Sequence, residues 1–526
     1  MEENLLILAN GLVLTCDPDN RAGRLSLFLE GGKIAAIAES PEPLMASYPA
    51  APVEDVSDSL IVPGFVNAHF HGESVFLRSA TDGKRMREWS TDPHVQHLTK
   101  ELSGASKQQL LAATYRAASA AHLKSGTTTV GEYLPGVDSD GLQSVLDALA
   151  TTGLRSVLAL QHWEQVEYVK GLADPGLRTL VSLGKAEDFT VYGFESNVLA
   201  ATELQCPMIV HVGETPDDGE YVRRKFSRSL LELLREYGIL HRETVLVHLN
   251  HLHSSDLRIV HMEGATVTLC PGSAVAKGTG CPLLRQLRST PVPVCLGTDW
   301  GTTDMMKEMQ FVLRLPLLFP DVAEFSAMQI LRMATIQGAA ALGIDAEVGS
   351  IEPGKSADLL RLSLDDIRTI PLPQTMTADA LASFLIDRLS TGQVADVMVR
   401  GEYLVRGGVL TRLDEEDVAG AFRALTAFPP PKVLSAGRQT GGGRTAARRE
   451  KKVPPATFSG GVREHLSGVE HAEPPETAIE SPAASDPPPE PGGSPSNSDA
   501  SHEQRPGLTP ALPKNVRRVF GEDDEA

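Results

Sequence analysis

The stretch "LIVPGFVNAHFHGES", Leu60–Ser74, holds the features from which the fold can be inferred. Its first part is a run of large apolar residues, typical of a strand buried on both faces, and the run ends at His69 and His71. Because residues two apart in a strand point to the same face, these two imidazoles can bind one ligand. An isolated pair of this kind is more often a packing feature than a metal site, so the rest of the chain must decide.

Seven further short apolar runs resemble the first one. Segments with helical periodicity separate most of them, such as Lys107–Gly126 and Ser227–Gly238. Eight buried strands alternating with helices predict a (β/α)8 TIM barrel, which fills residues 61–345. The seven runs are "TTTVGEY" (127–133), "RSVLALQ" (155–161), "FTVYGFE" (189–195), "MIVHVGE" (208–214), "TVLVHLN" (244–250), "TVTLCP" (266–271) and "VCLGTD" (294–299).

The segments on either side of the barrel have a different character. Residues 1–60 and 346–415 contain short strands separated by glycine turns, and we expect the two pieces to pair into one small, discontinuous β-sandwich domain. From residue 427 to residue 526, Pro, Gly, Ser and charged residues dominate, which predicts a disordered tail.

The composition restricts the class of partner. The chain has 526 residues and a formal net charge of -20, so nucleic acid and anionic membranes are not expected partners. Five scattered cysteines without a CxxC pair are typical of reduced thiols in a cytoplasmic protein. The N-terminus shows no signal-peptide pattern, and no apolar run reaches the roughly 18 residues that a membrane span needs. A small-molecule substrate is therefore the expected partner.

Ionisable residues stand at the C-terminal ends of four predicted strands, where barrel enzymes place their active sites. Three histidines and one aspartate among them form a nitrogen-rich ligand set that suits Zn²⁺, with Fe²⁺ as the alternative. A coordination position left for water would make the site catalytic. The predicted metal ligands are His69, His71, His211 and Asp299, and the remaining strand-end residues are Glu214 and His248.

Each of the catalytic candidates has a separate expected role. Glu214, three residues after His211, is placed to pass a proton to a substrate ring atom. Asp299 is expected to take the proton from the metal-bound water, and His248 to polarise the attacked group or orient that water. Taken singly, His248 is also compatible with a satisfied core histidine and Asp299 with a turn residue. Their joint occurrence in barrel order favours the catalytic interpretation.

The same motifs resemble the amidohydrolase superfamily, in its branch of aminoheterocycle deaminases and triazine hydrolases, which includes guanine deaminase, S-adenosylhomocysteine deaminase and atrazine chlorohydrolase. The resemblance covers about residues 5–415. It rests on "VPGFVNAHFHGESVFLR", "LKSGTTTVGEY", "VHVGETPDD", "LGTDWGTTDMMKEM" and "ILRMATIQGAAALGIDAEVGSIEPGKSADLL".

The resemblance implies the same metal ligands, a proton-relaying Glu214 and a water-activating His248. It also implies a single metal ion, since this branch lacks a bridging lysine on strand 4, and the "FTVYGFES" run offers none. Glu195 in that run is the one residue that could add a ligand. Members of the branch commonly form dimers, so a homodimer is expected.

The substrate-binding segments depart from the family pattern. The chain has no family-like histidine after strand 4, reads Leu269–Ala274 where relatives carry "HCP-S-N", and lacks the glutamate that holds ribose in adenosine-type deaminases. Arg78, Trp89 and Trp300 are the expected substrate contacts, with ordinary loop packing as the alternative. His94 and His97 lie in the same loop without an assigned role.

The sequence thus predicts a metal-dependent hydrolase of a carbon–nitrogen bond other than a peptide bond, which deaminates a small aminated heterocycle. Chloride, a substituted amine or a cyclic amide nitrogen is the alternative leaving group at the same site. A catalytically silent scaffold with this fold is the alternative of another class.

Overall fold

A computed structural model describes most of the chain up to residue 426. The described residues are 5–104, 107–134, 136–184, 190–252, 254–280, 283–287 and 290–426. The expected tail, residues 427–526, lies outside them.

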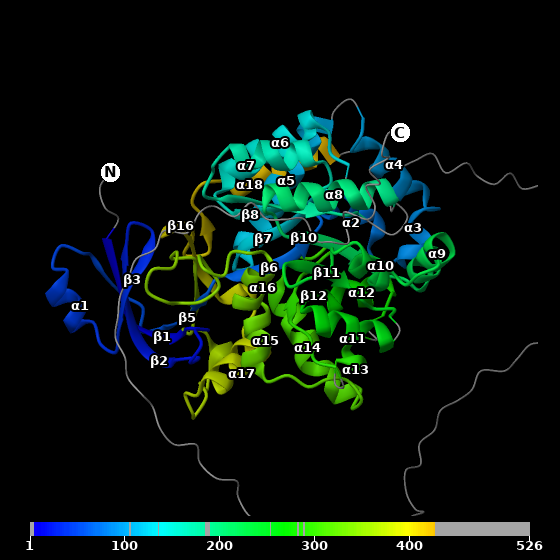
Figure 1. Ribbon diagram of the computed structural model, residues 1–526. Coiled ribbons are helices and arrows are strands. Elements are labelled where there is room, and N and C mark those ends of the chain that lie inside the picture. The colour runs from blue at the N-terminus through cyan, green and yellow to red at the C-terminus, as the bar shows by residue number, and fades with distance from the viewer. Residues whose placement is uncertain are drawn as a thin grey trace, which may run out of the picture. The chain divides into compact units, whose positions relative to one another are not determined.

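Eight parallel strands form the barrel, each hydrogen-bonded to the next in chain order (Figure 1). The ring closes between the last and first strands, where the Asp299 amide donates to the His69 carbonyl and the His71 amide to the Asp299 carbonyl, both at 2.9 Å. The strands are β6 (Phe65–Phe70), β7 (Thr127–Leu134), β8 (Arg155–Leu160), β9 (Leu177–Ser182), β10 (Met208–Val212), β11 (Thr244–His248), β12 (Thr266–Leu269) and β13 (Val294–Leu296).

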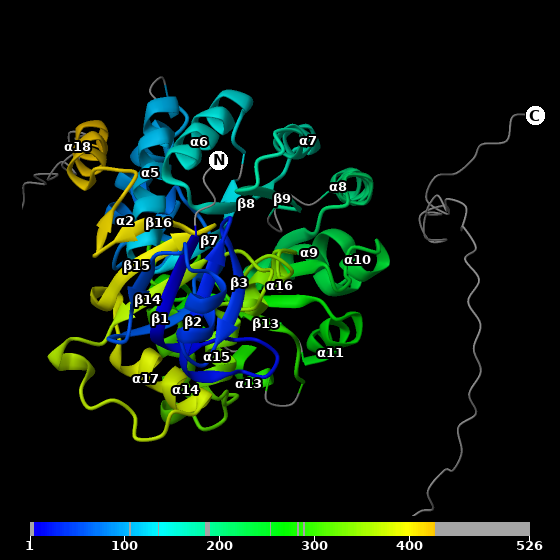
Figure 2. The same cartoon turned by 90° about the vertical axis from the view of Figure 1, so that its left-hand side faces the viewer.

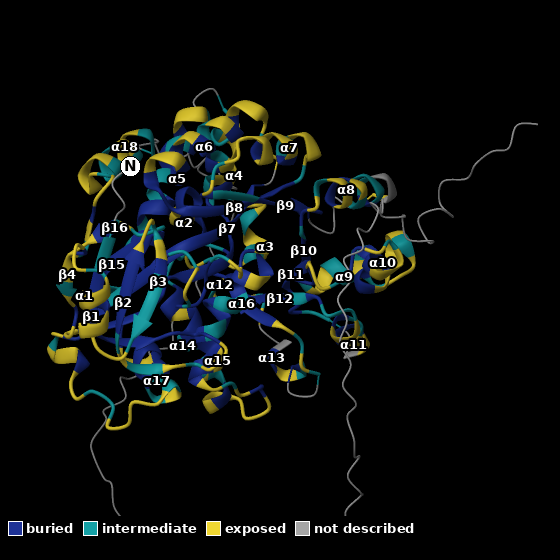
Figure 3. Ribbon diagram, turned by 60° about the vertical axis from the view of Figure 1, so that its left-hand side comes forward, coloured by how far each residue is buried: buried dark blue, intermediate teal, exposed yellow. Residues whose placement is uncertain are grey.

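Helices surround the barrel, and their outer faces are exposed while the strands are buried (Figure 3). They are α5 (Lys107–Lys124), α6 (Ser139–Thr152), α7 (Trp163–Gly171), α8 (Val191–Leu204), α9 (Pro216–Phe226), α10 (Leu230–Glu236), α11 (Ser254–Glu263), α12 (Pro271–Lys277), α13 (Leu283–Gln286), α14 (Met305–Leu318), α15 (Ala327–Met333) and α16 (Ile336–Ala341). The expected barrel with alternating helices is confirmed.

The fourth strand is not the one expected. The run "FTVYGFE" is rich in residues that favour strands, but Val191–Leu204 is the helix α8. The Thr190 hydroxyl accepts the Gly193 amide and begins this helix, and Phe194 stacks on Tyr237 with ring centroids 5.3 Å apart. The strand is instead Leu177–Ser182, "LRTLVS", which carries no lysine. Helix capping and tertiary packing therefore override local strand propensity here.

Small and branched apolar side chains fill the inside of the barrel. Ala68, Val157 and Val245 belong to one buried cluster that continues into α16. The Val66 amide, near the start of β6, donates to the Ala334 carbonyl just before α16. The N-terminal end of the barrel is thus closed by packing, which leaves the C-terminal end for a site.

The two ends of the described chain form a separate sheet beside the barrel, as expected (Figure 2). Its order is β17-β16-β15-β14-β5-β1-β2-β3, with β4 paired to β1. β5 and β14 join the two halves as antiparallel neighbours, with Ser59 opposite Ser363. The strands are β1 (Leu5–Leu14), β2 (Ala22–Glu30), β3 (Lys33–Ala38), β4 (Val53–Asp55), β5 (Ser59–Pro63), β14 (Leu359–Ser363), β15 (Val394–Val399), β16 (Glu402–Arg406) and β17 (Val409–Leu410).

The long loop after β6 folds into short helices over the barrel mouth. α2 (Ser74–Thr81), α3 (Met86–Trp89) and α4 (Pro93–Glu101) share an apolar cluster with Trp300, Phe422 and Leu425. The remaining helices are α1 (Glu42–Ser47), α17 (Ala378–Arg388), α18 (Glu415–Thr426) and the 3-10 turns Ile367–Thr369 and Thr391–Gln393. Among the described residues, no helix has the length and apolarity needed to cross a membrane.

Candidate active site

Six of the predicted residues meet at the C-terminal end of the barrel. His69 lies in β6 and His71 directly follows it, while the others stand at or just beyond the ends of β10, β11 and β13. All six are at most 5% exposed: His69, His71, His211, Glu214, His248 and Asp299. The parallel strands explain this convergence, because their C-terminal ends all lie on one face of the barrel.

The three predicted histidine ligands direct the same ring nitrogen to one point. His211 Nε2 lies 3.2 Å from His69 Nε2 and 3.4 Å from His71 Nε2. Four ligands arranged tetrahedrally at the usual Zn–N distance stand about 3.3 Å apart. Burial, followed by the charge of His71, lowers the pKa of His69 well below its usual value, so its imidazole is neutral and able to ligate.

A carboxylate oxygen completes this group. Asp299 Oδ1 lies 3.5 Å from His71 Nε2 and 3.8 Å from His69 Nε2. It is buried and accepts no hydrogen bond from the described residues. A buried carboxylate oxygen is costly to leave unpaired, so a cation among these nitrogens would satisfy it. The donor set and spacing therefore fit a divalent metal ion. Among the described residues, two overlapping groups could hold one: His69 with His71 and His211, and His69 with His248 and Asp299.

Glu214 and His248 flank the cluster on one side. His248 Nε2 lies 3.6 Å from Glu214 Oε2 and 3.9 Å from Asp299 Oδ2. Burial lowers the pKa of His248, although Glu214 and Asp299 oppose the effect. His248 and Asp299 both have left-handed backbones, with φ of 78° and 54°. Strain of this kind concentrates where side-chain direction matters for function.

Lys277, at the C-terminal end of α12, is the main residue of this group that the sequence analysis missed. Its Nζ lies 2.5 Å from Asp299 Oδ2 and 2.8 Å from Glu214 Oε1, and its side chain is only 5% exposed. Burial alone would lower the pKa of Lys277, but Asp299 and Glu214 raise it above its ordinary value. The ammonium is therefore charged at neutral pH.

The second oxygen of Asp299 has several polar neighbours. Ser273 Oγ donates to Oδ2 at 2.7 Å, beside the Lys277 ammonium. Burial by itself would raise the pKa of Asp299, but Lys277 and then His248 outweigh it and hold that pKa well below its usual value. Ser273 was noted in the sequence only as part of a departure from the family pattern, and no spacing rule singles it out.

Glu73 contacts the ring of His71, one of the predicted metal ligands. Its Oε1 lies 3.0 Å from His71 Nδ1, on the side of the ring opposite the cluster. The Gly72 amide donates to Glu132 at 2.6 Å, and a side chain at Gly72 would collide with Tyr115 and Glu132. These contacts position His71, because a hydrogen bond at Nδ1 leaves Nε2 facing the metal position.

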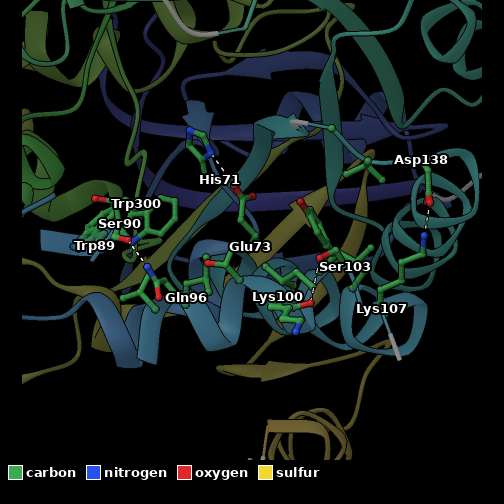
Figure 4. Close-up of a pocket in the computed structure, with 18 residues that line it drawn as sticks. His71, Glu73, Trp89, Ser90, Gln96, Lys100, Ser103, Lys107, Asp138 and Trp300 are labelled. Carbon is green, nitrogen blue, oxygen red and sulfur yellow. Dashed lines mark hydrogen bonds and ion pairs between the residues drawn. The ribbon is translucent and has the colours of Figure 1, made fainter. Parts of the chain in front are cut away.

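A cavity of about 910 Å³ opens beside the cluster (Figure 4). His71, Glu73, Trp89 and Trp300 line one end of it, and the α4–α5 segment lines the other. The rings of Trp89 and Trp300 lie 4.8 Å apart, and the Trp300 indole nitrogen donates to Thr81 at 3.1 Å. Both predicted tryptophans therefore line the end of the cavity that lies beside His71.

Other candidates from the sequence do not reach the cluster. Arg78 is exposed and donates to the Gly301 carbonyl at 3.5 Å, outside the lining of the cavity. His94 and His97 lie on α4 and do not line the cavity either. Glu195 lies on α8, where its charge adds to burial in raising the pKa of Tyr237, and it belongs to neither candidate metal group found among the described residues.

Comparison with known proteins agrees with this arrangement. Residues 60–404 match the amidohydrolase family. The 5-methylthioadenosine/S-adenosylhomocysteine deaminase of Pyrococcus abyssi is 27% identical over 443 residues, which cover 79% of this chain and 97% of that protein.

Two solved structures share the fold. An adenosine deaminase from Xanthomonas campestris with bound zinc gives a TM-score of 0.70 at 23% identity, covering 80% of this chain and 97% of that one. A zinc complex of atrazine chlorohydrolase from Arthrobacter aurescens TC1 gives 0.69 at 19% identity, covering 80% and 100%. At these identities the two structures show the fold alone.

Proposed function

The chain belongs to the amidohydrolase family, and from its site we propose that it is a metal-dependent deaminase of a small aminated heterocycle. The observation that carries the proposal is the close grouping of three imidazole nitrogens, two of which also lie within 3.8 Å of the unpaired Asp299 Oδ1. The deaminases among its relatives support the same reaction class.

His69, His71, His211 and Asp299 would hold the metal ion. When bound there, the ion supplies a water molecule that ionises near neutral pH. The two carboxylate oxygens of Asp299 face different groups. Oδ1 faces His71, a proposed metal ligand, and Oδ2 faces His248 and Lys277. Oδ2 lies outside the group of histidine nitrogens, where it accepts from Ser273 and Lys277, and we propose that this oxygen takes the proton as general base.

Glu214 would transfer the proton to the ring nitrogen of the substrate. It stands directly beyond β10, its side chain is 6% exposed, and His248 lies 3.6 Å away. A carboxyl in this position can protonate a ring nitrogen while the attacked carbon becomes tetrahedral, and ammonia then leaves. His248 would polarise the attacked group or orient the water.

Trp89 and Trp300 would bind the ring by stacking. Both line the cavity, and the centroid of the Trp300 ring lies 5.7 Å from that of the His71 ring. Flat aromatic faces suit a planar heterocycle, since they bury apolar area while leaving the ring edge to polar groups. Arg78, which is exposed and contacts the Gly301 carbonyl, would act only at the rim of the site.

We propose Zn²⁺ as the resident ion, with Fe²⁺ as the alternative. Three imidazoles and one carboxylate suit both ions, and softer or harder donor sets would favour others. Elemental analysis of protein purified without added metal distinguishes them, and one equivalent of zinc per chain is the expected result. Two equivalents would contradict the single-metal proposal.

A panel of aminated and chlorinated pyrimidines, purines and triazines tests the reaction. Release of ammonia from an aminated ring is expected, and Glu214→Gln should abolish it. Glu220→Gln, on the exposed side of α9, is the control and should keep wild-type turnover. Release of chloride or a substituted amine in place of ammonia would overturn deamination but keep the site. A chain that binds metal and hydrolyses nothing in the panel would favour a scaffold.

The expected homodimer and cytoplasmic location stay predictions. Light scattering of the purified chain measures its mass in solution, and fractionation of the native cells locates it.

A further inference from the structure

The helix α18 lies beside α5 at the end of the described chain (Figure 2). The Asp414 side chain caps its start by accepting two amides of the first turn. Lys124, the last residue of α5, donates to Glu415 at 2.7 Å and ties the same turn to the barrel. Because α18 follows residues 60–404, the family match does not account for this contact.

One face of α18 is apolar and turned toward the protein. Val418, Phe422 and Leu425 are spaced by four and three residues, which places them on one side of the helix, and all three are half-buried. Arg423 and Ala424, on the other side, are exposed. The helix is therefore held by apolar packing along its length and by polar contacts at its start.

Phe422 packs against two apolar clusters at once. One is the large cluster that α5 shares with the barrel strands. The other is the smaller cluster of the α2–α4 loop, residues 74–101. Leu425, Trp89 and Trp300 pack against this smaller cluster as well. The same apolar cluster thus connects α18 with the two tryptophans that are proposed to bind the substrate.

Helix α4 of this loop is attached through its apolar side chains. Asp92 caps α4 and Gln96 donates to the Ser90 carbonyl, and both contacts lie inside the loop. Such bonds shape the loop but do not fasten it to the barrel. Val95 and Leu98 are instead buried in the smaller cluster. A segment held by few buried apolar contacts opens more easily when one of them is removed.

The loop forms much of the wall of the large cavity. Trp89, Gln96, Thr99 and Leu102 all line it, whereas Phe422 lies outside the lining. Phe422 is therefore too far back to contact a substrate, but it packs against the segment that carries Trp89. A movement of the loop would change the position of Trp89 relative to the histidine cluster.

We propose that Phe422 is a positioning residue of the substrate site, which holds the α2–α4 loop against α5 and thereby fixes Trp89 beside Trp300. The part that the tryptophans play in binding rests on the proposed function, whereas the attachment of the loop does not. Without the Phe422 ring the smaller cluster has fewer apolar partners, so the loop opens more often and the indoles reach solvent. The catalytic candidates at the strand ends keep their places.

Quenching of tryptophan fluorescence by acrylamide tests the attachment of the loop without turnover. The chain has three tryptophans, and Trp163 is exposed, so Trp163→Phe leaves a signal from Trp89 and Trp300 alone. In the zinc-loaded full-length chain of this background, Phe422→Ala should raise the quenching constant about twofold or more, because an open loop exposes the indoles. Arg423→Ala, at an exposed position of the same helix, is the matched control and should leave the constant unchanged.

Steady-state kinetics tests the consequence for the substrate. With the ring of the panel that releases ammonia fastest, Phe422→Ala should raise KM about 2- to 10-fold and leave kcat nearly unchanged, as expected for weakened aromatic stacking. Phe422→Leu keeps an apolar side chain and should retain most of the parent affinity. Leu425→Ala, on the same face, should act in the same direction with a smaller effect. Thermal unfolding and metal content establish that each variant is folded and loaded.

Unchanged quenching in folded, loaded Phe422→Ala would overturn the inference, and so would an equal rise in Arg423→Ala. A lower kcat with unchanged KM would overturn it too, because the catalytic groups and not the tryptophans would then have moved. Raised quenching with both kinetic constants unchanged would show that the loop does not serve the substrate and would also refute it. Raised quenching without ammonia release from any ring refutes only the proposed reaction, whereas ammonia release with unchanged quenching refutes only the inference.

Discussion

Two buried polar groups lie at opposite ends of the barrel strands, and they differ in how completely their atoms are paired. At the N-terminal end, Arg155 donates to both carboxylate oxygens of Asp358, at 3.0 and 3.3 Å, and also to Ser356 and the Pro175 carbonyl. At the C-terminal end, His69 Nδ1 and Asp299 Oδ1 have no hydrogen-bond partner among the described residues.

The difference distinguishes an ion pair that stabilises the fold from a cluster that can bind a ligand. Arg155, at the start of β8, joins the barrel to the segment just before β14, and its charge is satisfied inside the protein. A buried ion pair of this kind is stable only when nearly all its hydrogen bonds are made. The cluster around Asp299 instead leaves polar atoms open to a ligand, which a purely structural cluster could not tolerate.

The largest expected effect is the loss of activity in Asp299→Asn. The amide is a weaker metal ligand and cannot serve as a base, so kcat/KM should fall by about a thousandfold or more. Bound metal should decrease, and a cooperative thermal transition should show that the variant is folded. Assays with the deaminated substrate and elemental analysis measure both. Asp345→Asn, at an exposed position, is the control, and near-normal turnover in Asp299→Asn would refute the assigned role.

Arg155→Met should instead destabilise the fold and leave the chemistry intact. Removal of one partner from a buried ion pair lowers the free energy of unfolding by about 3–5 kcal/mol. Arg178→Met is the matched control, because Arg178 pairs with Glu347 while 39% exposed and should contribute at most about 1 kcal/mol. Urea unfolding measures the difference. Equal losses in the two variants would show that the Arg155 cluster is not the structural one.

Glu73→Gln tests how the open cluster is held in place. The glutamine side chain keeps the size of Glu73 but removes the charge opposite His71 Nδ1, so metal affinity should fall by about 10- to 100-fold. Competition with a chelator measures the affinity. Glu101→Gln, on α4, supplies the control and should bind metal normally. Unchanged affinity in Glu73→Gln would mean that backbone packing alone orients His71.

His122 tests whether an unpaired buried nitrogen is enough to mark a functional site. It lies on α5 against Phe70, both its ring nitrogens are unpaired among the described residues, and burial lowers its pKa to about 3. The unfolded state takes up a proton below about pH 6.5 and the folded state does not. Stability should therefore fall as the pH decreases from 6.5 toward 3.

His122→Phe should remove this part of the acid sensitivity. Linkage gives a loss of about 2 kcal/mol between pH 7 and pH 5 for the parent protein, which the variant should not show. Denaturant unfolding at the two pH values measures it, and activity at pH 7 should be unaffected. Equal pH dependence in both proteins would contradict the buried, neutral state of His122. A single unpaired group thus influences stability, whereas function requires several that converge.

Much of the site could be predicted because strand geometry is local. Alternation in β6 places His69 and His71 on one face, and parallel strands bring their ends to one side of the barrel. His211, Glu214, His248 and Asp299 follow from the same rule, since each stands at or just after the end of a strand. The pairing of the flanking segments into one sheet was also predictable from their glycine turns and short strands.

The errors have a common physical origin. "FTVYGFE" has strong strand propensity, but the Thr190 cap and the contact of Phe194 with Tyr237 make it the start of a helix. The same mistake placed Glu195 near the metal site. Local propensity is a weak preference, and packing between distant segments overrides it.

The sequence by itself determined the order of strands and helices and the residue types at the strand ends, because these depend on short-range periodicity. Only the tertiary structure decided that Lys277 reaches Glu214 and Asp299, that Arg155 pairs with Asp358, and that Trp89 meets Trp300. These contacts join residues on different elements, whose distances depend on the packing of the whole barrel. The positions of the proposed metal ligands are thus predictable from strand ends, while the contacts of Lys277 and of the tryptophan pair are created only by folding.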